Sequence, residues 1–285
     1  GNWHTSWRGG NAIVVMPNGD VIAGGDFASM SGVANTNGIA AWNGTSWRSI
    51  GGGGIVYGLV VGLDGRLYAT GDFTVLGGVT VTRVANWNGS IWTAMGSGLD
   101  QTGFSITVSP IDGTIYVGGV FSLAGGVANT AGIAAWNGSV WSPLSTGITG
   151  SVSFTYGAVY ALAVNPTTGV LVVGGEFTTA GGSSIDSLAA WNGVYWVGLG
   201  SGVSAPAIDE ILINELAFGA DNMRSATGFF TSAGGIALAD RAARWNGYTW
   251  SHLDIDLPGL ARVQGLLVSK FADPVIKQKY NIYLG

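Results

Sequence analysis

The chain has 285 residues, of which 47% are hydrophobic and only 9% are charged, and its net charge is −5. This length suits one large all-β domain or two smaller domains, and the negative charge with scattered arginines excludes the clustered basic surface that nucleic-acid binding needs. The absence of cysteine excludes disulfides, thiolate metal sites and cysteine nucleophiles. No run of about 20 apolar residues occurs, so we expect no insertion into a membrane.

A repeat runs along the whole chain and is marked by its tryptophans. All 12 tryptophans fall in close pairs, at 3/7, 42/47, 87/92, 136/141, 191/196 and 245/250. The second members of successive pairs are 40 to 55 residues apart. This is the period of a four-stranded propeller blade.

Each repeat has the same internal order, which the copy at 159–198 shows well. Two apolar runs are joined by a short turn, and the second run ends in Gly-Gly-acid-Phe; a loop, a third strand, an Asn-Gly turn and a fourth strand follow. The first turns lie at 17–20, 63–66, 111–114 and 167–170. We interpret both kinds of turn as two-residue type I′ hairpins, which need positive φ at both central residues. No helix is predicted.

These repeats predict an all-β fold, a six-bladed β-propeller that forms a single domain over 1–285. Residues after 262 resemble the first two strands of a repeat, and residues 1–9 resemble a fourth strand, so a composite blade would close the ring and remove the free sheet edges. The alternative is part of a seven-bladed ring or of a longer array. The predicted blades are 11–50, 55–97, 103–146, 158–200, 211–253 and the composite of 262–285 with 1–9.

The tryptophans of the motif Trp-Asn-Gly-x-x-Trp, called the Trp motif below, are predicted to pack between neighbouring blades. With Asn43-Gly44 as a two-residue loop, Trp42 would oppose Thr45, and Trp42 and Trp47 would share one face of the blade. The alternative is a row of sugar-stacking platforms on the rim. The predicted structural residues are Trp42, Trp47, Trp87, Trp92, Trp136, Trp141, Trp191, Trp196, Trp245 and Trp250.

The asparagine of the Trp motif has two interpretations. Asn43, Asn88 and Asn137 are each followed by the Ser/Thr of a glycosylation acceptor. We prefer a structural role, in which Asn adopts the left-handed turn conformation, because Asn192 and Asn246 keep Asn-Gly without the hydroxyl residue.

The combination of Gly-Gly-acid-Phe with Ala-x-Trp-Asn-Gly-x-x-Trp resembles kelch-like propellers. It is more similar still to Trp-Asn-Gly repeat propellers of bacterial and fungal cell surfaces and of phage tail or fibre proteins. The resemblance covers essentially the whole chain. It implies a propeller fold and leaves function open, because propellers include enzymes, lectins and scaffolds.

Antiparallel order places the short turns at one end of each blade, and the long second-to-third and blade-to-blade connections at the other. Uniform turns carry the fold, whereas variable loops on a rigid scaffold more often carry recognition. We therefore expect ligand-binding residues on the long-loop end. The candidates are Asp100, Gln101, Phe154, Tyr156, Asp209 and Glu210; the alternative is an ordinary solvated loop.

Carboxylates recur at the Gly-Gly-acid-Phe position. Asp26, Asp72 and Glu176 would form a ring able to bind calcium, which takes oxygen ligands. In the alternative, which we prefer, each acid accepts N–H bonds from a neighbouring loop. No cofactor other than calcium is indicated. His4 and His252 are too few for a metal or acid–base set, and no nucleophile–base–orienter constellation is present.

We accordingly expect a non-catalytic recognition or adhesion propeller, extracellular, on a cell surface or on a virion. Its partner would be a glycan or a protein on a cell surface, or other subunits of a fibre or virion. Two alternatives stay open, a glycan-active hydrolase or lyase, and a purely structural module of a fibre or surface layer. Because the chain begins at Gly1, we expect it to be processed or cut from a longer protein.

Overall fold

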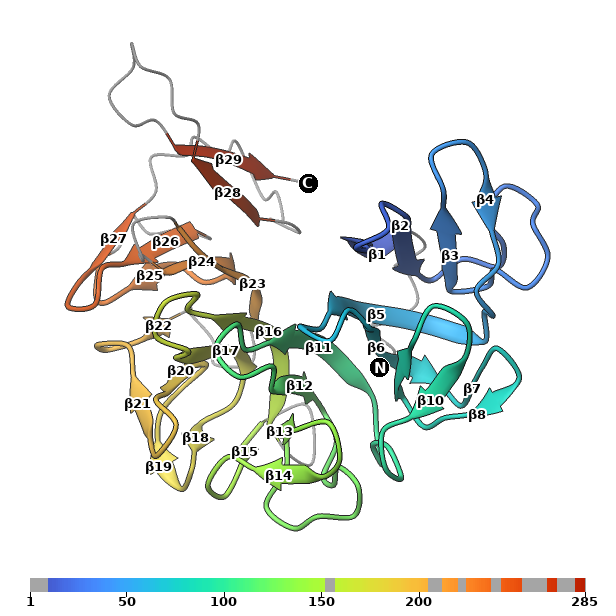
Figure 1. Cartoon of the computed structure of the whole chain (residues 1–285). Coiled ribbons are helices and arrows are strands. Elements are labelled where there is room, and N and C mark those ends of the chain that lie inside the picture. Colours follow the sequence, from blue (N-terminus) through green and yellow to red (C-terminus); the bar gives the residue numbers. More distant parts are fainter. Residues whose placement is uncertain are drawn as a thin grey trace. The chain divides into compact units, whose positions relative to one another are not determined.

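A computed structural model describes residues 10–151, 157–204, 212–219, 224–236, 242–252, 266–270 and 280–284 (Figure 1). In these residues all regular structure is β-strand, and no helix occurs. The chain forms two compact units, Gly1–Pro143 and Leu144–Gly285. The predicted all-β class is therefore confirmed for the described part of the chain.

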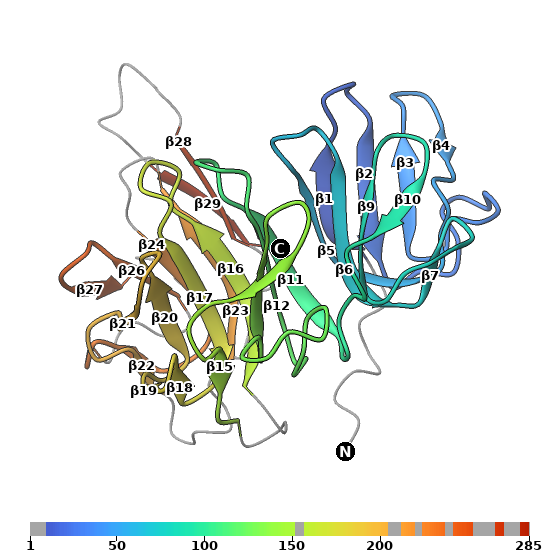
Figure 2. The same ribbon diagram turned by 60° about the horizontal axis from the view of Figure 1, so that its bottom comes forward.

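Three four-stranded antiparallel sheets make up the first unit, and each keeps the strand order of the chain. Figure 2 shows this order across the first sheet. The first sheet contains β1 (Gly10–Val15), β2 (Val21–Gly25), β3 (Ile39–Trp42) and β4 (Trp47–Arg48). The second contains β5 (Gly54–Val61), β6 (Leu67–Phe73), β9 (Val84–Trp87) and β10 (Trp92–Ala94). The third contains β11 (Gly103–Val108), β12 (Ile115–Gly119), β13 (Ile133–Trp136) and β14 (Trp141–Pro143).

The second unit contains two such sheets and a hairpin. One sheet consists of β16 (Ala158–Val164), β17 (Leu171–Glu176), β20 (Leu188–Trp191) and β21 (Trp196–Gly198). The other consists of β23 (Leu212–Phe218), β24 (Arg224–Phe229), β26 (Ala242–Trp245) and β27 (Trp250–His252). The hairpin pairs β28 (Leu266–Lys270) with β29 (Tyr280–Leu284), and β28 lies beside β23. Residues 1–9 of the predicted composite blade lie outside the described residues.

Short ladders join the long loops of each unit. Within one loop β7 (Val75–Leu76) pairs with β8 (Val79–Thr80), and β18 (Thr179–Ala180) pairs with β19 (Ser183–Ser184). Two further ladders join a sheet-to-sheet connection to the loop of the sheet that follows it. They are β15 (Ile148–Thr149) with β18, and β22 (Val203–Ser204) with β25 (Ser232–Ala233).

First strands lie side by side within each unit, β5 between β1 and β11, and β23 beside β16. Every one of them has a register shift against its partner, with one extra residue at the same point of the repeat. The extra residues are Asn11, Tyr57, Phe104, Tyr160 and Asn214. Bulges of this kind bend a strand and re-aim its side chains, so the inner strands present a repeated irregularity near their long-loop ends.

The Gly-Gly pair of the repeat is explained by this bulge and by the next sheet. A Cβ on Gly71 would lie 2.1 Å from the Ile55 carbonyl oxygen of the bulged strand. A Cβ on Gly24, the first glycine of its pair, would lie 2.7 Å from Cγ1 of Val56 on the next sheet. The second strand therefore has no room for side chains at these two positions.

The core lies between sheets that pack face to face. One cluster joins the first and second sheets and includes Ile22, Ile39, Leu67 and Trp92; another joins the second and third sheets. A third cluster joins the two sheets of the second unit. Each sheet thus buries both faces against its neighbours where neighbours exist, which accounts for the high apolar content of all four strands.

The third-to-fourth turns differ from the prediction by one residue. Trp42 lies directly opposite Trp47, not opposite Thr45, because the Asn43 side chain takes part in the turn. Asn43 Oδ1 accepts the backbone N–H groups of Thr45 at 3.0 Å and Ser46 at 2.9 Å, and only Gly44 has a positive φ, of 96°. The type I′ assignment and the left-handed Asn were therefore wrong; the Asn is a side-chain acceptor, as in an Asx turn.

The first-to-second turns are also longer than predicted. Met16 N donates to Asp20 O at 2.8 Å and Gly19 N donates to Met16 O at 2.9 Å, with φ of 89° at Gly19. This leaves a three-residue connection with glycine in the left-handed position. The hairpins at these places are confirmed, but their two-residue type I′ geometry was wrong, because Asn18 keeps a negative φ and hydrogen-bonds to the backbone of Asp20 instead.

Candidate binding site

The two tryptophans of each Trp motif contact each other and the neighbouring sheet. Ring centroids within a pair are 5.2 to 6.4 Å apart, with tilted planes. The indole Nε1 of Trp92 donates to the Ile50 carbonyl at 2.6 Å, and that of Trp141 donates to the Met95 carbonyl at 2.8 Å. Trp196 and Trp250 repeat this bond within the second unit. Each acceptor is the residue three places after the second tryptophan of the preceding Trp motif. The indole hydrogen bond therefore joins consecutive sheets.

This burial leaves little indole surface for a ligand. Trp87, Trp92, Trp136, Trp141, Trp196, Trp245 and Trp250 are buried, whereas Trp42, Trp47 and Trp191 are partly buried. A sugar-stacking platform needs an exposed ring face, so the seven buried tryptophans do not offer one.

The connections between sheets are tied to the long loops by a repeated backbone hydrogen bond. Gly77 N donates to Gly51 O at 2.9 Å, and Gly125 N donates to Gly98 O at 2.7 Å. The same bond recurs from Gly181 to Gly147 and from Gly234 to Gly202. A Cβ on the donor glycine would clash with the second tryptophan of the Trp motif in the same repeat. For Gly125 it would lie 2.4 Å from Cδ1 of Trp141. At the long-loop end of each unit, backbone hydrogen bonds and close glycine contacts therefore join consecutive sheets.

Asp100 takes part in this cross-linking. Its Oδ1 accepts the backbone N–H groups of Ser122 at 2.9 Å and Leu123 at 3.0 Å, and its Oδ2 accepts the Ser122 hydroxyl. The expectation of an acid that accepts N–H bonds from a neighbouring loop thus describes Asp100, which sequence reasoning placed among the ligand-binding residues. Gln101 is exposed beside it. Phe154, Tyr156, Asp209 and Glu210 lie outside the described residues.

The three acids of the Gly-Gly-acid-Phe position have three different environments. Asp72 is exposed, and its Oδ1 lies 3.8 Å from Nε of Arg83. Glu176 is buried and accepts the hydroxyl of Ser151. Asp26 is partly buried, and no described residue hydrogen-bonds to its carboxylate or forms an ion pair with it.

Calcium at these acids stays a prediction. Among the described residues no group of three or more His, Asp or Glu gathers in a metal-binding arrangement. The six to eight oxygen ligands that calcium takes would have to come largely from backbone and water. His4 lies outside the described residues.

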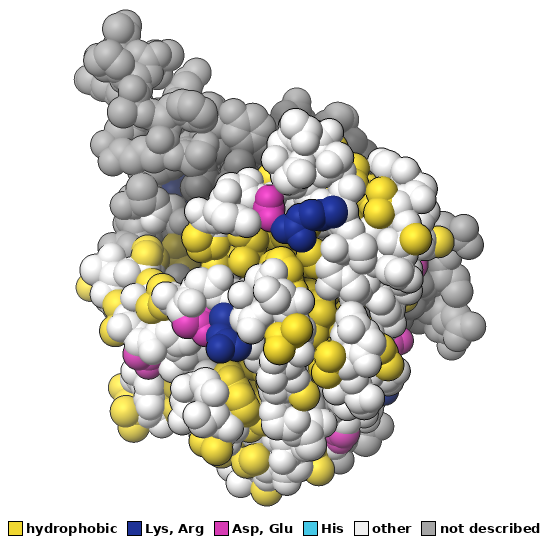
Figure 3. Space-filling view, turned by 45° about the vertical axis from the view of Figure 1, so that its right-hand side comes forward, with side chains coloured by type: hydrophobic (Ala, Val, Ile, Leu, Met, Phe, Trp, Pro, Cys, Tyr) yellow, Lys and Arg dark blue, Asp and Glu magenta, His cyan; other side chains and the backbone are white. Residues whose placement is uncertain are grey.

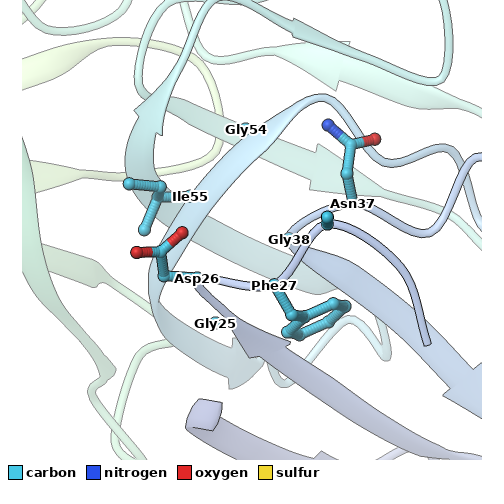
Figure 4. Close-up of a pocket in the computed structure, with 8 residues that line it drawn as sticks. Gly25, Asp26, Phe27, Asn37, Gly38, Gly54 and Ile55 are labelled. Atoms are coloured by element: carbon cyan, nitrogen blue, oxygen red, sulfur yellow. The ribbon is translucent and has the colours of Figure 1, made fainter. Parts of the chain in front are cut away.

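The Asp26 carboxylate lines an open pocket of about 660 Å³ at the long-loop end of the first two sheets. Such a volume lies within the roughly 300–1,000 Å³ of small-molecule sites. The lining residues are Gly25, Asp26, Phe27, Ala28, Asn37, Gly38, Gly54 and Ile55. In Figure 4 the carboxylate points toward the Ile55 side chain, and Asn37 lies beyond Gly38.

Glycines shape this pocket. Gly38 has φ of 77°, and a Cβ there would lie 1.6 Å from the Gly54 carbonyl oxygen, so the long loop of the first sheet touches the start of β5 backbone to backbone. A side chain at Gly38 would separate the two segments. Sequence reasoning considered Asp26 as one member of a possible calcium-binding ring, and nothing in the sequence alone marked Asn37 or Gly54 as its neighbours.

Two carboxylates act on the Tyr57 phenol at this end of the first unit. Burial raises the pKa of the Tyr57 phenol, and the negative charges of Asp72 and Asp26 raise it further. Tyr57 is the bulge residue of β5, and its ring meets that of Phe104 edge-on at 5.6 Å. Figure 3 shows that charged side chains are few on the face that it presents.

Comparison with protein-family models finds no match, and comparison with curated proteins finds none either. The likeness to kelch-like and Trp-Asn-Gly repeat propellers therefore stays a prediction from the repeat. The described residues contain no helix long and apolar enough to cross a membrane.

Proposed function

We propose that the chain forms a six-bladed β-propeller whose sixth blade is completed by the two ends of the chain. Five four-stranded meanders with bulged first strands support this proposal, as does the β28–β29 hairpin, which lies beside β23 as the next first strand would. Closure would cover the free faces of the first and last sheets and remove their exposed edges.

Deletion of residues 1–9 tests the closure. If these residues complete the last blade, their removal lowers the melting temperature by at least about 3 °C, the shift expected for a loss of roughly 2 kcal/mol in a chain of this size. An unchanged melting temperature would favour the open array or the larger ring.

We further propose that the protein is a non-catalytic recognition propeller, extracellular or on a virion, whose long-loop end binds a glycan or protein partner. The observation that carries this proposal is the repeated Gly-to-Gly cross-link, from Gly77 to Gly51 and its equivalents. A surface held in one conformation loses little entropy when it binds, and the open pocket lies on this surface.

A glycan array, a cell-surface protein array and a turnover assay on the bound glycans test the function together. Binding without turnover is the expected result. Turnover would instead identify a hydrolase or lyase, and no binding on either array would favour a structural module of a fibre or surface layer.

A further inference from the structure

The pocket at Asp26 combines an acid, an amide and apolar surface in a form that the equivalent positions do not repeat. The corresponding carboxylates of Asp72 and Glu176 have protein partners, Arg83 and Ser151. Asp26 has none among the described residues, although it is not exposed at a loop tip but held at the end of β2. Its acceptor atoms are therefore available to a ligand.

The other walls supply complementary chemistry. The Asn37 side chain is exposed, with no hydrogen bond to a described residue. Ile55 is half-buried and presents apolar surface next to the Asp26 carboxylate (Figure 4). Carboxylate and amide groups recognise vicinal donors, whereas an apolar wall suits the carbon face of a ring.

The carboxylates near the pocket favour a positively charged ligand. Two carboxylates act on Tyr57 beside the pocket, and Arg83 is paired with one of them. An anionic ligand would be repelled, and a cation with three donors would gain charge-assisted hydrogen bonds. Calcium fits less well than an ammonium group, because an ammonium group needs three acceptors rather than six to eight oxygens.

We propose that this pocket binds an amino sugar through its free ammonium group, with Asp26 as the acceptor and Asn37 and Ile55 against the ring. The proposal rests on the recognition function and names its ligand class. A lysine side chain offers the same ammonium group, but it makes no use of the amide or of a pocket of about 660 Å³. A polyhydroxylated ring would fill the pocket and hydrogen-bond to the Asn37 amide.

Isothermal titration with a glucosamine trimer and an N-acetylglucosamine trimer, at a mildly acidic pH that keeps the amine protonated, tests the proposal. The two trimers differ in charge and in the acetyl groups. We expect the acetylated trimer to bind at least about tenfold more weakly, the loss typical of a hydrogen bond to a charged group. Raising the salt concentration should weaken binding of the charged trimer, since an open pocket is screened.

Variants localise the effect. Asp26→Asn keeps the shape of the side chain and should weaken binding of the glucosamine trimer at least about tenfold. Asp112→Asn makes the same change of net charge on a first-to-second turn and keeps an acceptor for the Thr114 N–H, so its affinity should equal that of the unmodified protein. Melting temperatures of both variants, measured in parallel, show that the fold is retained.

Three results would overturn the proposal: an unchanged affinity of Asp26→Asn, equal binding of the two trimers, or equal binding of a short peptide with one lysine. If other glycans or proteins on the arrays still bind in any of these cases, the recognition function stands and only this ligand assignment falls. Absence of all binding on the arrays removes the recognition function itself.

Discussion

Trp141 both fills space between sheets and donates a hydrogen bond, and comparison with Trp136 separates these roles. Each side chain is 6% exposed, and the two rings pack at 5.2 Å. Trp141 Nε1 donates to the Met95 carbonyl, whereas Trp136 makes no hydrogen bond from its indole to a described residue. The two positions therefore differ in the hydrogen bond and match in burial.

Trp141→Phe removes the indole donor and leaves the carbonyl of the fully buried Met95 with the Gly98 N–H, at 3.1 Å, as its remaining partner. The lost hydrogen bond costs about 0.5–1.5 kcal/mol of the free energy of unfolding. The smaller ring also loses burial worth about 2 kcal/mol at about 0.8 kcal/mol for each buried carbon. Trp136→Phe incurs only the second loss. We thus expect losses of about 2.5–3.5 kcal/mol for Trp141→Phe and about 2 kcal/mol for Trp136→Phe.

Equilibrium unfolding in urea, followed by far-ultraviolet circular dichroism, measures both losses without relying on tryptophan fluorescence. The midpoints convert to free energies if the denaturant slopes of the two variants agree. Equal destabilisation by the two substitutions would refute the reasoning, because it would show that the hydrogen bond to the Met95 carbonyl contributes nothing beyond packing.

Three further predictions concern the turns and one partly buried acid. Gly125→Ala would place Cβ 2.4 Å from Cδ1 of Trp141 and should lower the melting temperature well beyond Gly126→Ala, which has positive φ of 75° but open space; equal shifts would contradict this. Asn137→Ala removes the acceptor of two turn amides and should cost about 1–2 kcal/mol in urea unfolding, whereas Asn137→Asp should be nearly neutral. Burial raises the pKa of Glu215 from 4.5 to about 7, so the folded state favours the protonated acid. Stability should therefore fall as pH rises from 4.5 through about 7, and Glu215→Gln, compared by melting temperature across that range, should abolish this fall.

The repeat could be recognised in the sequence because each strand is either an alternation of apolar and polar residues or a continuous apolar run, and glycine-rich turns separate the strands. This local pattern predicted the strand order of the five four-stranded sheets and the packing role of the tryptophan pairs. The turn types were wrong for a specific reason. Asn-Gly is the strongest short signal for a type I′ turn, but at Asn43 the side-chain oxygen captures two backbone amides and moves the turn by one residue.

The site was only partly predictable. Sequence reasoning identified the long-loop end and the acid position, since loop length and repeat alignment are properties of the chain. It treated Asp26, Asp72 and Glu176 as equivalent, and it placed Asp100 among ligand contacts. The differences arise from residues distant in sequence, namely Arg83 beside Asp72 and Ser122 beside Asp100.

The sequence by itself determined the strand meander, the period and the positions of the turns, because these follow from hydrophobic pattern and local backbone preference. Only the tertiary structure decided which carboxylate is left without a partner. That outcome depends on which side chains of adjacent loops reach each acid of the Gly-Gly-acid-Phe position. Such contacts join segments that the repeat brings together in space but that no spacing along the chain encodes.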